Sequence, residues 1–483
     1  MLIRPLQGLA LGLTVCALQA QNPAMGNITA QMQQQQFQAQ QMYQMQRQMQ
    51  MQMQMNMQMQ SQMAMQRQMQ AQRSAQLAQQ QHELKLASAR TLLTFPTTVL
   101  AKPQAEVWSS DLQQMSCFPL IDDQRLIATS GVSRRMKRLD PVSGQVLWGY
   151  SLPQKLSGEP VLVNGSVIFA TDHPGITILD ADTGKERKTI GLHPLAPFLF
   201  GAKADHPRAT TPVSYEGRVY VTTFGDGRNG PAGWVYALDL ASMTLAWEMP
   251  FEGGVDLMPI PSGEQIFAAG AGRVVSFDLK DGKRRWECKL GAKDEIKTWT
   301  LIGSTLAVIA NGQIHAIDSR SGALIWSMPF DGRPILQGEN DRLIYTESRG
   351  LFRPKEWIVA LDLKTGNKAW DLKVGQSLIP WVQSGKVYGN AEEALIALDL
   401  LTGKTLWTQK LAEAPRLPLA LSGDSLYAVV GSGKETHLKA LKAADGSIAW
   451  ETSCPDPEPF GMLLPTEQGF LFPKADRSLA LLK

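Results

Sequence analysis

The sequence predicts an all-β fold built from repeated four-stranded sheets, and two observations support this prediction. A short motif, Asp-x-x-Thr/Ser-Gly-x-x-x-Trp, recurs along the chain, and its clearest copy spans residues 399–407. The copies follow one another with a period near forty residues, which is the signature of a repeat architecture. Forty residues accommodate about four strands of 5–6 residues with their turns. Each repeat is therefore predicted to form one blade of a β-propeller.

The glycine position of the motif sets the period. It falls at residues 144, 184, 243, 282, 322, 366, 403 and 446, at intervals of 40, 59, 39, 40, 44, 37 and 43 residues. Three copies depart from the motif, because Lys188 replaces the tryptophan, Met243 replaces the glycine and Lys442 replaces the aspartate. The long second interval indicates an insertion between the second and third copies.

Each residue type in the motif has a structural role in the predicted blade. Asp and Thr/Ser side chains hydrogen-bond the backbone of a tight turn, and Gly supplies a positive φ. The tryptophan lies on the next strand, where a large ring fills the wedge between neighbouring blades. We therefore expect these tryptophans to be mostly buried at equivalent positions: Trp148, Trp247, Trp286, Trp326, Trp370, Trp407 and Trp450.

The repeated motif resembles that of the PQQ-like, or quinoprotein-type, β-propeller family, from about residue 105 to the C-terminus. The resemblance implies a ring of blades docked by tryptophans, usually eight of them. In repeat type and architecture the chain is most similar to the propeller proteins of the outer-membrane β-barrel assembly machinery, which implies a role in protein contacts. The fold alone does not set the function, because one fold hosts many activities.

The two ends of the repeat region predict how the ring closes. Residues 106–112 resemble the last strand of a blade with its own tryptophan, Trp108, and residues 460–482 resemble the first three strands of a blade. Paired with each other, they would complete a composite blade and close the ring. Eight motif copies plus this composite blade make nine blades. The family resemblance implies eight, and we take eight as the expectation, with the copy around Lys188 forming no full blade.

Residues 1–20 are predicted to be a secretory signal peptide. Arg4 precedes a short apolar stretch, and cleavage fits after Ala17 or Ala20. An apolar stretch this short does not span a bilayer of about 30 Å as a helix. We therefore expect no transmembrane span and a periplasmic or secreted location, with an outer-membrane lipoprotein modified at Cys16 as the alternative.

Residues 21–95 form a Gln/Met-rich low-complexity segment ahead of the propeller, which we place at 96–483. Gln-rich tracts are usually disordered, and both residue types also favour helix, so we expect a disordered or helical tail that acts as a spacer. Thioethers are soft ligands that select Cu(I). The alternative is therefore copper binding by the alternating methionines Met51, Met53, Met55, Met57 and Met59.

The insertion between the second and third copies carries the candidate binding site. Its extra residues lie at about 198–208 and 225–231 and include His206, Arg208 and Arg228. Long loops on a rigid scaffold often carry binding function. We expect these three side chains to face a partner, and a solvated loop without function is the alternative.

No catalytic residue is predicted. The PQQ-dependent dehydrogenases that share this fold typically hold an adjacent cysteine pair over the cofactor and bind Ca²⁺, whereas the cysteines of this chain stand apart at positions 16, 117, 288 and 454. We therefore expect no cofactor, and PQQ with Ca²⁺ is the alternative. Cys117 and Cys454 both fall near the predicted ring closure, where a disulfide is left open.

These features together favour a binding protein. The formal net charge of +3 argues against nucleic acid as a partner. We expect a non-catalytic, exported, monomeric β-propeller that acts as a protein-binding or envelope-assembly scaffold for a protein partner in the cell envelope. The alternatives are a PQQ-dependent oxidoreductase and a copper-binding protein.

Overall fold

The chain divides into two compact units, residues 1–81 and 82–483. In the first unit the computed structural model describes only helical residues, at 37–38, 41–42, 45–46, 49, 52–53 and 63–71. In the second it describes 100–483 except for gaps at 113–117, 123, 131–133, 172–174, 193–207, 225–232, 256, 292–295, 351–354, 375–379, 392–393, 412, 414, 432–434 and 459–460.

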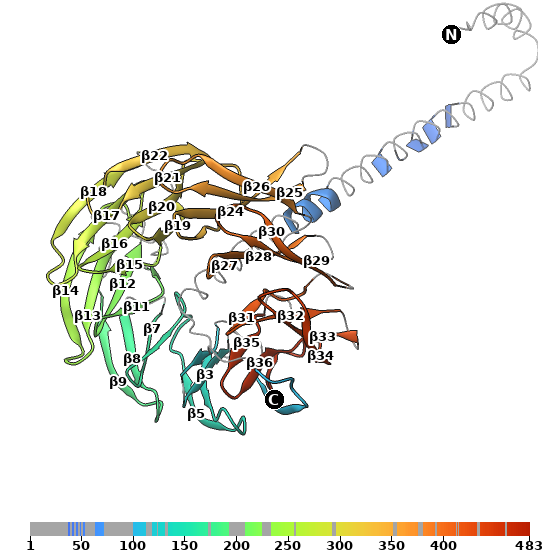
Figure 1. Ribbon diagram of the computed structural model, residues 1–483, viewed down its shortest axis with the longest axis horizontal. Helices are drawn as coiled ribbons and strands as arrows, with labels where there is room; N and C mark the ends of the chain where they lie inside the picture. Colours follow the sequence, from blue (N-terminus) through green and yellow to red (C-terminus); the bar gives the residue numbers. More distant parts are fainter. Residues whose placement is uncertain are drawn as a thin grey trace, which may run out of the picture. The chain divides into compact units, whose positions relative to one another are not determined.

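The described residues of the second unit form nine antiparallel sheets, which we number as blades 1 to 9 in chain order (Figure 1). Blades 1 to 3 comprise β2 (Leu120–Ile121), β3 (Leu126–Ser130), β4 (Arg135–Leu139) and β5 (Val146–Ser151); β6 (Val161–Val163), β7 (Ser166–Thr171), β8 (Gly175–Asp180) and β9 (Glu186–Gly191); and β10 (Arg208–Ala209), β11 (Val213–Tyr215), β12 (Arg218–Phe224), β13 (Gly233–Asp239) and β14 (Thr244–Phe251). Blades 4 to 6 comprise β15 (Ile260–Ser262), β16 (Gln265–Gly270), β17 (Arg273–Asp278) and β18 (Arg284–Lys289); β19 (Ile296–Ile302), β20 (Thr305–Ala310), β21 (Gln313–Asp318) and β22 (Leu324–Pro329); and β23 (Gln337–Glu339), β24 (Arg342–Arg349), β25 (Lys355–Asp362) and β26 (Lys368–Val374). Blades 7 to 9 comprise β27 (Trp381–Gln383), β28 (Lys386–Ala391), β29 (Ala394–Asp399) and β30 (Thr405–Lys410); β31 (Ala420–Ser422), β32 (Ser425–Val430), β33 (His437–Lys442) and β34 (Ile448–Ser453); and β35 (Leu464–Thr466), β36 (Gly469–Pro473), β37 (Ser478–Leu482) and β1 (Glu106–Asp111).

Blade 9 is the predicted composite blade that closes the ring. Strand β1 pairs antiparallel with β37, with Ser109 opposite Ala480. The residues next to these two strands continue the pairing, because the Lys483 amide donates to the Ala105 carbonyl at 3.0 Å. The first strand of the repeat region is thus the outer strand of the last blade.

The count of nine blades that follows from the two ends is confirmed, and the expectation of eight is wrong. The motif copy around Lys188 forms a complete blade 2, in which β8 pairs with β9 and Ile178 lies opposite Lys188. The physical reason is that a blade is held by its own hydrogen-bonded ladder, whereas the missing tryptophan acts between blades. Loss of the tryptophan side chain therefore weakens the joint between two blades, but the four strands of the blade still form a sheet.

The core lies in the joints between blades. Nine clusters of buried apolar residues fill the nine joints, each with members from two neighbouring blades. Tyr388 and Leu426, for example, pack together in the joint between blades 7 and 8. Burial of both faces explains why the second and third strands of each blade read as continuous apolar runs.

The antiparallel order gives the ring two different faces. The turns that join the first to the second strand and the third to the fourth strand lie at one end of each blade, and we call this end the turn face. The hairpins between the second and third strands, and the connections to the next blade, lie at the other end, which we call the loop face.

Candidate functional site

The motif aspartates of the turn face are occupied by their own turns. Asp318 Oδ1 accepts the hydroxyl of Ser321 at 2.6 Å and the amide of Ser321 at 2.7 Å. The hydroxyl and amide of Ser321 hold the pKa of Asp318 below its usual value of 3.8. The same pair of bonds joins Thr402 to Asp399. These carboxylates therefore shape turns and leave little capacity for a ligand.

Seven of the nine outer strands carry a tryptophan that hydrogen-bonds the turn of the next blade. Its indole Nε1 donates to the carbonyl of the residue after the motif aspartate, or after Lys442 in the last case: Trp108 to Pro141, Trp148 to Ala181, Trp247 to Leu279, Trp286 to Ser319, Trp326 to Leu363, Trp370 to Leu400 and Trp407 to Ala443, at 2.8–3.1 Å. The ring lies against the motif glycine, so that a Cβ added at Gly403 would be 2.5 Å from Trp370. We call this arrangement the Trp clamp.

The seven tryptophans singled out from the sequence occupy one equivalent position on the outer strands. Trp247, Trp370 and Trp407 are buried, and the other four are half-buried. Six of the seven form Trp clamps. Trp450 instead packs against the rings of Tyr427 and Phe470, because the third and fourth strands of blade 9, β37 and β1, are not joined by a turn.

A second clamp of the turn face was not predicted from the sequence. At the start of the second strand, opposite the motif aspartate, a long basic side chain reaches the turn of the next blade. We call these contacts basic clamps: Arg125 to Asp182, Arg218 to the Leu279 carbonyl, Arg342 to the Leu401 carbonyl and Lys386 to the Ala443 carbonyl. Only some blades have a basic residue at this position, so no regular pattern in the sequence revealed them.

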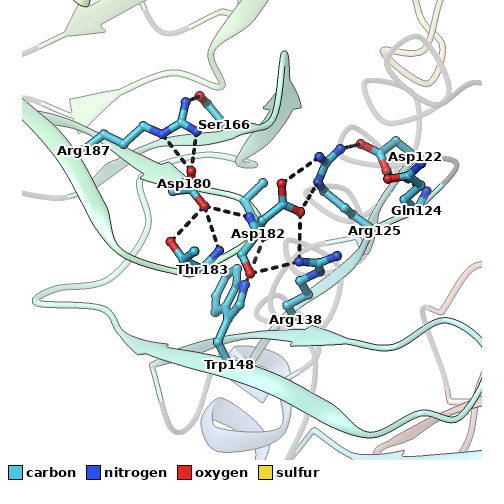
Figure 2. Close-up of polar contacts among 11 residues, drawn as sticks. Asp122, Gln124, Arg125, Arg138, Trp148, Ser166, Asp180, Asp182, Thr183 and Arg187 are labelled. Atoms are coloured by element: carbon cyan, nitrogen blue, oxygen red, sulfur yellow. Dashed lines mark hydrogen bonds and ion pairs between the residues drawn. The ribbon is translucent and has the colours of Figure 1, made fainter.

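The basic clamp between blades 1 and 2 is part of a wider ion-pair network (Figure 2). Arg125 bridges Asp122 at 2.8 Å and Asp182 at 2.9 Å, and Arg138 Nη1 also lies 2.9 Å from Asp182. Arg187 pairs with Asp180 in the same blade. The hydrogen bond from Arg125 holds the pKa of Asp182 below its usual value. The network therefore joins blades 1 and 2.

The loop face of blade 6 offers a different arrangement, which we take as the candidate contact site. The guanidinium of Arg349, at the end of β24, lies 4.4 Å from the ring centroid of Trp357 on β25. Glu347 pairs with Arg349, and Asp371 Oδ2 lies 2.7 Å from its Nη1. Lys368, at the turn-face end of β26, also pairs with Asp371 at 2.9 Å.

These side chains combine exposure with fixed geometry. The side chain of Arg349 is 37% exposed, and Trp357 is half-buried. Tyr345 hydrogen-bonds Glu347 at 3.2 Å, and burial and the charge of Glu347 raise the pKa of its hydroxyl. Stacked Arg and Trp side chains of this kind are frequent among the residues that dominate protein–protein binding energy. The sequence analysis missed this group, because its members are spread over three strands and match no motif.

Most of the predicted binding and metal residues lie outside the described residues. These are His206, Arg228, Met51, Met55, Met57 and Met59. Arg208 opens β10, where its backbone pairs with Phe224. Phe224 directly precedes 225–231, so the pairing brings the ends of the two inserted segments together. Met53 is helical and 58% exposed.

The described residues show no further reactive cluster. They bring no three His, Cys, Asp or Glu side chains together as a potential metal site. None of the helices within them has the length and apolar character needed to cross a membrane. Cys454 carries a free thiol, and burial raises the pKa of this thiol to about 12. The free thiol does not support a disulfide with Cys117, which lies outside the described residues.

Comparison with known proteins gives related sequences of one kind. An outer membrane protein assembly factor BamB of Yersinia pestis is 25% identical over 237 residues, which cover 46% of this chain and 58% of the relative. The BamB of Moranella endobia is 24% identical over 266 residues, which cover 50% of this chain and 66% of the relative. The chain thus matches less than two thirds of the length of either relative.

Similar solved structures include BamB from Moraxella catarrhalis, with a TM-score of 0.46, 18% identity, and coverage of 67% of this chain and 96% of that one. A europium-containing methanol dehydrogenase has a TM-score of 0.43, 14% identity, and coverage of 76% and 84%. At these TM-scores neither likeness bears on the function.

The family assignment comes from the sequence profile of the outer membrane protein assembly factor BamB. It matches residues 98–188, 200–334 and 310–459, which is more than half of the chain and spans most of the propeller. The chain therefore belongs to the family of the outer membrane protein assembly factor BamB.

Proposed function

We propose that this protein is an exported, non-catalytic scaffold that binds a protein partner in the cell envelope during the assembly of outer-membrane proteins. The observation that carries the proposal is the family match across the propeller. The Y. pestis and M. endobia relatives are both named as assembly factors for outer membrane proteins. No cofactor takes part in the proposed activity.

The use of polar groups in the ring supports a scaffold. The motif aspartates form turns, and the Trp clamps and basic clamps join blades, so the regular polar residues of the turn face serve the architecture. A ring held at so many joints presents its described strand ends, such as Arg349 at the end of β24, in fixed positions. Groups that are already ordered lose less conformational entropy on binding.

We place one partner contact at the Arg349–Trp357 group on the loop face of blade 6. Trp357 supports the guanidinium from one side, and Glu347 and Asp371 fix its direction. A partner therefore meets an arginine that needs little further ordering. A planar, partly exposed guanidinium with neighbouring carboxylates suits a segment that offers both backbone carbonyls and a basic or amide side chain.

The insertion between blades 2 and 3 remains the second proposed contact. The pairing of Arg208 with Phe224 supports it, because the backbone holds the ends of both inserted segments next to each other. In this proposal His206, Arg208 and Arg228 contact the same partner.

Binding variants test both contacts. The purified chain is immobilised, and its affinity for the outer-membrane assembly proteins captured from an envelope extract is measured. Arg349→Ala/Trp357→Ala is expected to weaken binding at least about tenfold, because truncation of anchoring Arg and Trp residues commonly costs about 2 kcal/mol or more. Arg208→Ala/Arg228→Ala tests the insertion.

The matched control is Lys364→Ala. Lys364 belongs to the same blade and pairs with Asp341, but it lies on the turn face and its side chain is 73% exposed. Its replacement is expected to leave the affinity unchanged. Equal binding by the wild type and both double variants would exclude these contacts, and failure to capture any outer-membrane assembly protein would contradict the scaffold function.

A further inference from the structure

The joint between blades 2 and 3 lacks both clamps of the turn face. Lys188 stands on β9 where other outer strands have the clamp tryptophan, and Met243 stands where the next turn has its glycine. The basic-clamp position of blade 2 is Ser166, whose hydroxyl accepts a bond from Arg187 of its own blade at 3.0 Å.

The joint between blades 8 and 9 also has neither clamp, with Ser425 at the basic-clamp position, but there Trp450 of the outer strand packs against Phe470. Among the described residues, the joint between blades 2 and 3 is the only one whose outer strand offers no tryptophan.

Both halves of the Trp clamp are absent together. At Gly403 an added Cβ would be 2.5 Å from the clamp ring, so a side chain and a clamp tryptophan exclude each other. Met243 keeps the positive φ of the turn, at 53°, without the freedom of glycine. A non-glycine residue in this region is strained. The turn of blade 3 therefore has no clamp and a strained residue, and among the described residues it is held across the joint only by the apolar packing of Leu240 and Met243.

The inner side of the same joint is held differently. Before β6 the Glu159 amide donates to the Thr211 hydroxyl at 3.0 Å, which links the segment that leads into blade 2 to the segment within blade 3 that precedes β11. A Cβ on Gly158 would lie 2.6 Å from the Thr211 amide nitrogen, which shows how closely these two segments approach. Between this contact and the outer rim the joint contains apolar side chains, including Ile178 and Leu238.

We propose that the joint between blades 2 and 3 is a built-in hinge, at which the outer strands of the ring separate before those of any other joint. The inner contact at Thr211 acts as the pivot. The opening exposes Ile190 of β9, which is buried in the joint, together with Leu240 and Met243 of the turn at 239–244. Apolar packing is non-directional, so it tolerates sliding and reclosure better than a hydrogen bond onto a fixed turn does.

Hydrogen–deuterium exchange of the full wild-type chain tests the hinge. The amides of β9 and of the turn at 239–244 are compared with those of β30 and of the turn at 442–447, which belong to a clamped joint. Exchange at the hinge is expected to be faster by about tenfold or more, since local opening follows the local loss of stabilising contacts. Equal protection at the two joints would overturn the proposal.

Transplanting the clamp tests its cause. Lys188→Trp/Met243→Gly supplies both missing halves, and it is expected to slow exchange at the hinge about tenfold, the effect of one well-packed hydrogen-bonded contact. Met243→Gly alone supplies no tryptophan, and it is expected not to slow exchange at the hinge. Conversely, Trp407→Ala is expected to raise exchange in β30 toward the rate in β9. If β30 keeps its protection without Trp407, the clamp does not control opening and the hinge is refuted.

Discussion

Removal of one clamp tryptophan is the sharpest test of what holds the ring together. Trp407 is 7% exposed, donates to the Ala443 carbonyl at 3.1 Å and covers Gly446 of blade 8. Trp407→Ala removes the indole, opens a cavity in the joint and leaves the Ala443 carbonyl with the Lys386 ammonium as its remaining side-chain donor. Truncation of a large buried aromatic residue costs about 3–5 kcal/mol, and we expect the free energy of unfolding to fall by that amount.

Two further variants separate the contributions. Trp407→Phe keeps most of the packing and loses the hydrogen bond, so a decrease of about 1 kcal/mol is expected. Gly446→Ala is expected to destabilise by more than about 1 kcal/mol, because the glycine has a φ of 73° and an added Cβ would lie 2.5 Å from the Trp407 ring.

The measurement is denaturant unfolding followed by circular dichroism, with Lys188→Ala as the matched control. Lys188 occupies the same strand position in blade 2, but it is exposed, and its side chain makes no hydrogen bond or ion pair among the described residues. Its replacement is expected to change stability by less than about 0.5 kcal/mol. Similar losses for Trp407→Ala and Lys188→Ala would refute the clamp as the element that joins blades.

Three other predictions concern acid, the tail and cofactors. Hydrogen bonds from their own turns lower the pKa values of Asp140, Asp318 and Asp399 from 3.8. The stability that these carboxylates contribute is therefore present above about pH 4 and is lost as the pH falls below it. Thermal melts from pH 7 to 2 should show the Tm decreasing only in the acid range, and a constant Tm would contradict this. Deletion of residues 21–80 should leave the Tm of the propeller nearly unchanged, and Cu(I) competition with a chelator before and after deletion should show no tight site, whereas tight binding lost on deletion would support the copper-binding alternative. Addition of PQQ and Ca²⁺ should give no dye-linked oxidation of alcohols or sugars, and stoichiometric PQQ uptake with substrate-dependent dye reduction would support the oxidoreductase alternative.

The architecture was largely predictable, because the motif encodes contacts that repeat in space. The Asp-to-Gly spacing fixes the turn, and the Trp position fixes the joint, so both could be read from one chain. The blade number was harder. Lys188 suggested a missing blade, yet the ladder of β6 to β9 needs no tryptophan to form. A motif copy without its tryptophan indicates a weaker joint between two blades, whereas the apolar runs indicate that the strands form a sheet.

The contacts that vary between blades could not be predicted. The residues of the basic clamps are equivalent only through their place in the ladder, where each lies opposite its motif aspartate: Arg125, Arg218, Arg342 and Lys386. Other blades have a short or uncharged residue at this position. Arg349 and Trp357 come together only across the β24–β25 hairpin. Such contacts depend on strand register, which the sequence spacing alone does not give.

Partner binding by the full-length protein tests the central claim most directly. The tagged chain is expressed in a cell with an outer membrane, the envelope is solubilised, and the captured proteins are identified and then titrated against the purified chain. We predict that an outer-membrane assembly protein is captured, and that its affinity falls at least about tenfold for Arg349→Ala/Trp357→Ala while Lys364→Ala binds as the wild type does. Absence of any outer-membrane assembly protein among the captured proteins, with the tagged chain folded and present in the envelope, would contradict the scaffold function.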